Sequence, residues 1–121
     1  MRTRDDHDDR VPALLADIAR FGRSAARVTA RGTERFHDPD DDDQRRIARS
    51  LAVDLSAAAD RLPQHVRDAH PDVDWLGIRA VRNFVAHDYD GTDENLLWRV
   101  VAVEFPRILA ALGLTESDGP R

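Results

Sequence analysis

Apolar residues recur three or four positions apart along most of the chain, which is the spacing of residues on one face of an α-helix. The first series predicts a helix from about Pro12 to Ala30, because Pro12 suits a first helical turn and Gly32 a helix end. Its apolar positions are Leu14, Leu15, Ile18, Phe21, Ala25 and Val28. A second series predicts a helix from about Gln44 to Leu62, followed by Pro63. Its apolar positions are Ile47, Leu51, Leu55, Ala58 and Leu62.

The second half of the chain predicts two further helices. One runs from Trp75 to about Asp88, with Asp74 as its N-cap. The other is capped by Asp93 and continues through Leu112, and Pro106 inside it predicts a kink or a break. Its apolar positions are Leu96, Leu97, Val100, Val101, Val103, Phe105, Ile108 and Leu112. A short helical turn is expected after Pro63.

These elements predict an all-α fold, because no segment shows the strict alternation of a strand. Four main helices joined by short loops, with one additional helical turn, favour an antiparallel helical bundle. We expect one domain over residues 11–113 of the 121-residue chain. Residues 1–10 are charged and are expected to form a mobile tail, and residues 114–121 a frayed one.

Composition limits the classes of partner. All 18 basic residues are arginine, and the net charge is −5. No overall positive field attracts nucleic acid, so any RNA site must be a local patch, for which arginine forks are well suited. The chain has no cysteine, which excludes disulfides and thiolate metal sites. No apolar run approaches the roughly 20 residues of a membrane span, and the N-terminus lacks the apolar core of a secretion signal. We expect a cytoplasmic protein.

An acidic stretch, "FHDPDDDD", runs from Phe36 to Asp43. Its carboxylates are consecutive and lack the alternating spacing and the glycine of a calcium loop. We therefore expect no metal site here, and no cofactor is implied elsewhere. One of the aspartates is expected to cap the next helix, where the positive end of the helix dipole favours acidic neighbours.

The stretch "RAVRNFVAHDY" places four polar groups on the third predicted helix, namely Arg82, Asn83, His87 and Tyr89. A histidine can take the proton from a ribose 2′-hydroxyl or give one to the leaving oxygen, and an arginine can hold the scissile phosphate. Asn83 can hold His87 or a phosphate. His87 lies near a helix C-terminus, where the dipole favours the protonated imidazole. This chemistry is RNA cleavage without a metal; the simpler alternative is a solvated helix face.

The spacing of the two main groups suggests a shared site. Arg82 and His87 are separated by about 140° around a straight helix, so both do not face one substrate atom. A two-fold dimer resolves this, because equivalent helices then bring arginine and histidine together from two chains. The remaining histidines, His7, His37, His65 and His70, are interpreted as surface residues. Trp75 and Trp98 are interpreted as core or interface anchors.

"RNFVAHDY" matches the pattern Arg-x4-His-x-Tyr and resembles the HEPN superfamily, specifically the HepT-like toxins of HepT/MNT toxin–antitoxin systems. The resemblance extends over roughly residues 43–112 and includes "RIARSLAVDLSAAADRL", "HPDVDWLGIRAVRNFVAHDYDGTDENLLWRVV" and "FPRILAAL". There is one departure: Ser56-Ala57-Ala58 stands where the family often carries Gly-Glu-Ala.

The resemblance implies a homodimeric helical bundle that acts as a metal-independent RNase toxin. Arg82 and His87 would be catalytic, with Asn83 supporting them. Tyr89 would accept AMP from a minimal nucleotidyltransferase antitoxin, which would place a negative phosphate beside Arg82. Two alternatives remain open. In the first alternative, the chain is a non-catalytic accessory or substrate-binding subunit of a nucleotidyltransferase, and the absent acidic residue and the negative net charge favour it. In the second, the chain is a dimerisation scaffold.

Overall fold

The computed structural model describes the backbone of residues 2–87 and 93–115, and the surroundings of the side chains of residues 10–85 and 93–115. Every element in these ranges is helical, so the prediction of an all-α fold is confirmed. The elements are α1 (Arg2–Ala30), α2 (Thr33–Phe36), α3 (Asp43–Arg61), α4 (Gln64–Asp68), α5 (Trp75–His87), α6 (Glu94–Arg99), the π-helix η1 (Val100–Glu104) and α7 (Phe105–Ala111). None of the described helices is both long enough and apolar enough to cross a membrane.

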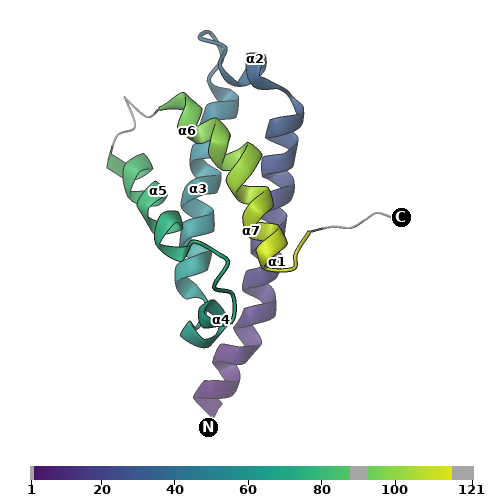
Figure 1. Cartoon of the computed structure of the whole chain (residues 1–121), viewed down its shortest axis with the longest axis vertical. Helices are drawn as coiled ribbons and strands as arrows, with labels where there is room; N and C mark the ends of the chain where they lie inside the picture. Colours follow the sequence, from purple (N-terminus) through teal and green to yellow (C-terminus); the bar gives the residue numbers. More distant parts are fainter. Residues whose placement is uncertain (1, 88–92, 116–121) are drawn as a thin grey trace, which may run out of the picture.

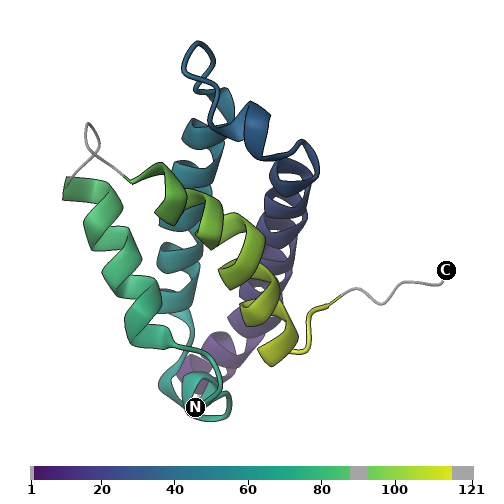
Figure 2. The same ribbon diagram turned by 45° about the horizontal axis from the view of Figure 1, so that its top comes forward.

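The long helices α1 and α3 lie side by side, and the remaining elements pack around them (Figure 1). α5 lies against α3, while α6, η1 and α7 form one bent rod that crosses α1 and α3. The same arrangement is seen after the molecule is turned, in Figure 2. The short helices α2 and α4 occupy opposite ends of the bundle. The core is shared between α1, α3, α5 and the bent rod.

The first helix differs from its predicted start. α1 begins at Arg2, so Pro12 lies inside the helix rather than in its first turn, and residues 2–10 are part of the helix. A proline inside a helix removes one backbone hydrogen bond, and the acidic residues of this stretch favour the positive end of the helix dipole. A search for apolar periodicity does not detect this extension, because residues 2–10 contain no apolar residue. The mobility of residues 1–10 and the domain limits 11–113 and 114–121 stay predictions.

Three predicted helix boundaries are confirmed by their local geometry. The carboxylate of Asp74 accepts a hydrogen bond from the amide of Gly77 at 2.8 Å, and that of Asp93 accepts one from the amide of Asn95 at 2.8 Å. Gly32 follows α1 with a φ of 95°, a conformation that favours glycine. α3 and α5 fall within one residue of their predicted ranges wherever the chain is described.

Two residues predicted for the core are exposed instead. Ile47 is 37% exposed because it lies at the edge of the buried stripe of α3, next to solvent. Val103 is 39% exposed because it lies in η1, where the wider π-helical turn changes which residues face inward.

The break predicted at Pro106 is confirmed, and η1 lies directly before it. Pro106 occupies the first turn of α7 and has no N–H, so it cannot donate to the carbonyl of Val101 in the π-helical pattern. The hydroxyl of Thr29 lies 3.3 Å from that carbonyl and 3.0 Å from the carbonyl of Ala25. α1 therefore offers a replacement donor at the point where the rod loses one.

Candidate functional site

α5 carries the polar motif, and its orientation is fixed from both ends of its described part. The indole N–H of Trp75 lies 3.2 Å from the carbonyls of Arg67 and His70, which ties the start of α5 to the end of α4. Ile78 and Val85 are buried, and this core contact turns the opposite face of α5 toward solvent.

Arg82 and Asn83 both lie on the exposed part of α5. Arg79, one turn earlier, forms an ion pair with Asp60 of α3, at 2.9 Å between Nη2 and Oδ1. Arg82 forms no ion pair with any residue in the described part of the chain. Its guanidinium group is therefore available to an external anion.

His87 is the last residue of α5, so its predicted position at a helix C-terminus is confirmed for the backbone. Its side chain, and all of Tyr89, lie outside the described residues. The structure thus places Arg82 and Asn83 on the exposed surface of one helix, and the approach of His87 or Tyr89 to them stays a prediction.

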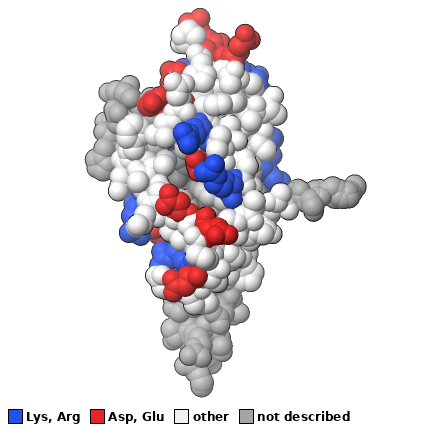
Figure 3. All heavy atoms as spheres, in the orientation of Figure 1, with Lys and Arg blue, Asp and Glu red and all other residues white. Residues whose placement is uncertain are grey.

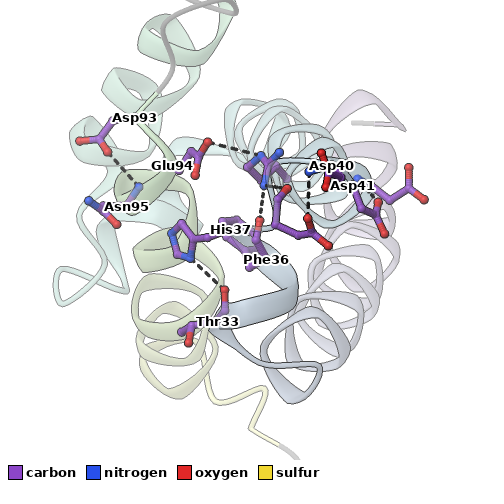
Figure 4. A network of polar contacts seen from close by, with 11 residues as sticks. Thr33, Phe36, His37, Asp40, Asp41, Asp93, Glu94 and Asn95 are labelled. Carbon is purple, nitrogen blue, oxygen red and sulfur yellow. Dashed lines mark hydrogen bonds and ion pairs between the residues drawn. The ribbon is translucent and has the colours of Figure 1, made fainter.

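A buried arginine joins three segments near the start of α6 (Figure 4). Nη1 of Arg45 donates to the carbonyls of Phe36 at 2.6 Å and Asp38 at 3.0 Å, and its Nε lies 3.7 Å from a carboxylate oxygen of Glu94. One guanidinium group of α3 therefore holds the end of α2 and the first turn of α6. The sequence pattern does not reveal this role, because the side chain is charged and the helix periodicity assigns it no partner.

The expected side-chain cap at the N-cap of α3 is not formed, and the aspartates after α2 bind nearby backbone amides instead. Asp38 accepts from the amide of Asp40 at 2.8 Å, and Asp41 accepts from that of Asp43 at 3.0 Å. Asp42, in the N-cap position of α3, makes no such side-chain bond. In the ranges that the structure describes, no three His, Asp or Glu side chains are grouped as a metal site.

His37 is not the surface residue that the sequence predicts. It is partly buried, its ring lies 5.2 Å from that of Phe36 and 6.4 Å from that of Trp98, and its Nδ1 lies 3.0 Å from the carbonyl of Thr33. Phe36 itself is fully buried and meets the ring of Trp98 at 5.2 Å. This aromatic cluster confirms Trp98 as an anchor and fixes α2 against α6.

A groove of about 440 Å³ lies between α5 and the bent rod, with α3 as its floor. Asp72 and Asp74 line one side, and Arg99 and Arg107 the other. Both arginines lie near the carboxylate of Glu104, at 3.5 and 3.8 Å. Figure 3 faces this side of the molecule and shows basic and acidic side chains interleaved. Because its cations are already paired, this groove is a poor anion site.

The fold and the motif helix together define a small helical protein whose motif helix carries an exposed arginine, without an ion pair to the described residues, five positions before a histidine. A family model described as ribonuclease HepT-like matches residues 17–113. The chain therefore belongs to the HepT-like ribonuclease family, as its motif and flanking segments indicate.

Similar proteins include one from Thermococcus cleftensis named "Probable ribonuclease HepT", which is 26% identical over 62 residues, 51% of this chain and 56% of that protein. Another, from Caldanaerobacter subterraneus subsp. tengcongensis, carries the designation RNase and is 30% identical over 64 residues, which are 53% of this chain and 56% of that relative. The chain spans about half the length of the curated relatives it matches. No solved structure matches it significantly.

Proposed function

We propose that the protein is a metal-independent endoribonuclease and the toxin of a toxin–antitoxin system, acting in the cytoplasm. The observation that carries this proposal is Arg82, which is exposed on α5, has no ion pair with the described residues, and lies five residues before a histidine that ends the same helix. Membership in the HepT-like ribonuclease family supports the class of reaction.

In the proposed reaction, the ribose 2′-oxygen attacks the neighbouring phosphorus and the bond from phosphorus to the 5′-oxygen breaks. His87 takes the proton of the 2′-hydroxyl, and a protonated His87 gives one to the leaving 5′-oxygen. Arg82 stabilises the negative charge that grows on the phosphate, and Asn83 orients His87 or the phosphate. The products are a 2′,3′-cyclic phosphate and a 5′-hydroxyl.

We further propose that the active form is a homodimer in which the outward face of α5 meets its counterpart. Leu76 is 79% exposed, and positions 80, 83 and 87 follow it on the same helix face. Phe84, beside this face, is also an exposed large apolar residue. An apolar side chain this exposed favours a covering partner, and two-fold pairing of α5 brings Arg82 of one chain toward His87 of the other.

The proposal predicts that the purified protein cleaves single-stranded RNA in the presence of EDTA, because the proposed reaction assigns no step to a metal ion. The products, separated by electrophoresis, are expected to carry 2′,3′-cyclic phosphate ends, detected by their resistance to phosphatase until acid opens the ring. Cleavage that stops in EDTA and returns with a divalent ion contradicts the proposed chemistry.

We also propose that a minimal nucleotidyltransferase neutralises the protein by transferring AMP from ATP to Tyr89. A phosphate on Tyr89 would compete with RNA for Arg82, two helical turns before it. Incubation with that partner and ATP is expected to add the mass of AMP to the intact protein, and Tyr89→Phe to prevent the addition. Mass added equally to Tyr89→Phe excludes Tyr89 as the acceptor.

A second candidate function, a non-catalytic accessory or substrate-binding subunit of a nucleotidyltransferase, is favoured by one observation on α3. Where the family often has an acidic residue, this chain has Ala57, flanked by the fully buried Ser56 and by Ala58. No carboxylate is therefore available there to shape a site. A stable complex with the nucleotidyltransferase, combined with no RNA cleavage by the free protein, would support this candidate over the nuclease.

A further inference from the structure

The ion pair between Arg79 and Asp60 marks one side of the contact between α5 and α3. Gly77 and Val81 of α5 line the groove, and each is rotated from Arg79 by about 160° around the helix. The side with the ion pair therefore faces away from the groove. Arg82 lies about 60° from Arg79 around α5, so it borders the same side.

Arg49 of α3 borders this side as well. It precedes Asp60 by 11 residues, which is three turns and about 20° of rotation, so both lie on one face of α3. α3 and α5 run in opposite directions. Measured along the helix axes from the ion pair, Arg82 lies about 4.5 Å away and Arg49 about 16.5 Å away in the same direction. Side chains lean toward the N-terminus of their own helix, so these two lean apart by more than their roughly 12 Å axial separation.

Arg49 carries a positive charge that no described carboxylate neutralises. Its side chain is partly buried and its Nε is fully covered without a hydrogen-bond partner among the described residues, so a bound phosphate would meet the terminal Nη groups. It forms no ion pair with the residues that are described. The acidic residue on the same face of α3, Asp60, is paired with Arg79. By contrast, Arg45, Arg99 and Arg107 all have carboxylate neighbours.

We propose that Arg49 is a second phosphate contact for single-stranded RNA, on the nucleotide chain beyond the phosphate held by Arg82. This inference rests on the proposed ribonuclease function. Two guanidinium groups that have no ion pair with the described residues lean apart on one side of the α3–α5 contact and hold two different phosphates of one strand. These two arginines would give a chain of net charge −5 a local positive patch for RNA on this side.

The test measures binding of a labelled single-stranded RNA to the His87→Ala protein, which does not cleave it, over a range of salt concentrations. Arg49→Gln in this background is expected to weaken binding about tenfold and to reduce the slope of log K against log salt by about 0.7, the loss of one phosphate contact. Arg61→Gln is the matched control, because Arg61 is an exposed arginine of the same helix, rotated by about 120° from Arg49.

Arg49→Gln that binds with the affinity and salt slope of Arg61→Gln overturns the inference and leaves the proposed function standing. Absence of RNA binding by the parent protein overturns both. If Arg49→Gln does not fold, as judged by circular dichroism, Arg49→Lys decides. Because lysine keeps the charge, the salt slope is expected to persist, and a slope reduced in folded Arg49→Lys contradicts a phosphate contact.

Discussion

Replacement of His87 by alanine is expected to reduce RNA cleavage by about 10²- to 10⁴-fold, the contribution of a positioned general acid or base. His87 ends α5, where the helix dipole is expected to favour the imidazolium that, in the proposed reaction, donates a proton to the leaving oxygen. The fold is expected to persist, because His87 is the last residue of α5 and no later turn of this helix depends on it. The measurement is the single-turnover rate of cleavage of a labelled RNA in EDTA, with circular dichroism of both proteins.

His70→Ala provides the control for this loss. His70 lies between α4 and α5, outside the motif, and its backbone carbonyl, which binds Trp75, is unaffected by the substitution. Cleavage by His70→Ala is expected to equal that of the parent protein, which also tests for a contaminating nuclease. Equal rates for His87→Ala and the parent protein would remove His87 from the mechanism.

The dimeric site makes a stronger prediction for mixed chains. If Arg82 of one protomer acts with His87 of its partner, a dimer of one Arg82→Ala chain and one His87→Ala chain contains one intact site. Random exchange of subunits then restores about a quarter of the parental activity, since about half of the dimers are mixed and each has one intact site of two. No recovery on mixing, with subunit exchange verified by mass, contradicts a site shared in this way.

The sequence predicts the main helices and their ends accurately where two independent signals agree. α3 and α5 combine apolar periodicity with a starting aspartate, and α6 begins at the cap predicted for it. The break before Pro106 follows from the missing N–H. The π-helical form of η1 does not follow from the sequence. The carbonyl that is left without a backbone donor depends on how α1 packs against the rod.

The candidate site is predictable only in part, for a related reason. Spacing along α5 places Arg82 on its exposed side without knowledge of any other helix. The availability of Arg82 depends on which arginines meet carboxylates from other elements, as Arg79 meets Asp60 and Arg45 meets Glu94. These are tertiary contacts between residues 19 and 49 positions apart, and periodicity carries no information about them.

The same limit applies to the core, and it predicts a large difference between two substitutions. Phe36→Ala is expected to lower the free energy of unfolding by about 3–5 kcal/mol, the usual cost of removing a buried aromatic side chain. Phe36 is fully buried, contacts the rings of His37 and Trp98, and its own backbone carbonyl accepts a hydrogen bond from Arg45. Phe36 is the first residue of the acidic stretch and belongs to no apolar series, so the sequence pattern does not assign it to the core. The measurement is urea unfolding followed by circular dichroism.

Ile47→Ala is the matched comparison, because the sequence places Ile47 in the apolar stripe of α3 and the structure leaves it partly exposed. Its expected cost is about 1 kcal/mol, since part of its apolar surface already meets water. The m-value is expected to stay the same in both variants, so that the shift of the midpoint reports stability alone. A larger loss for Ile47→Ala than for Phe36→Ala would mean that helix periodicity identifies the core better than the observed packing, and that α2 does not anchor the bundle.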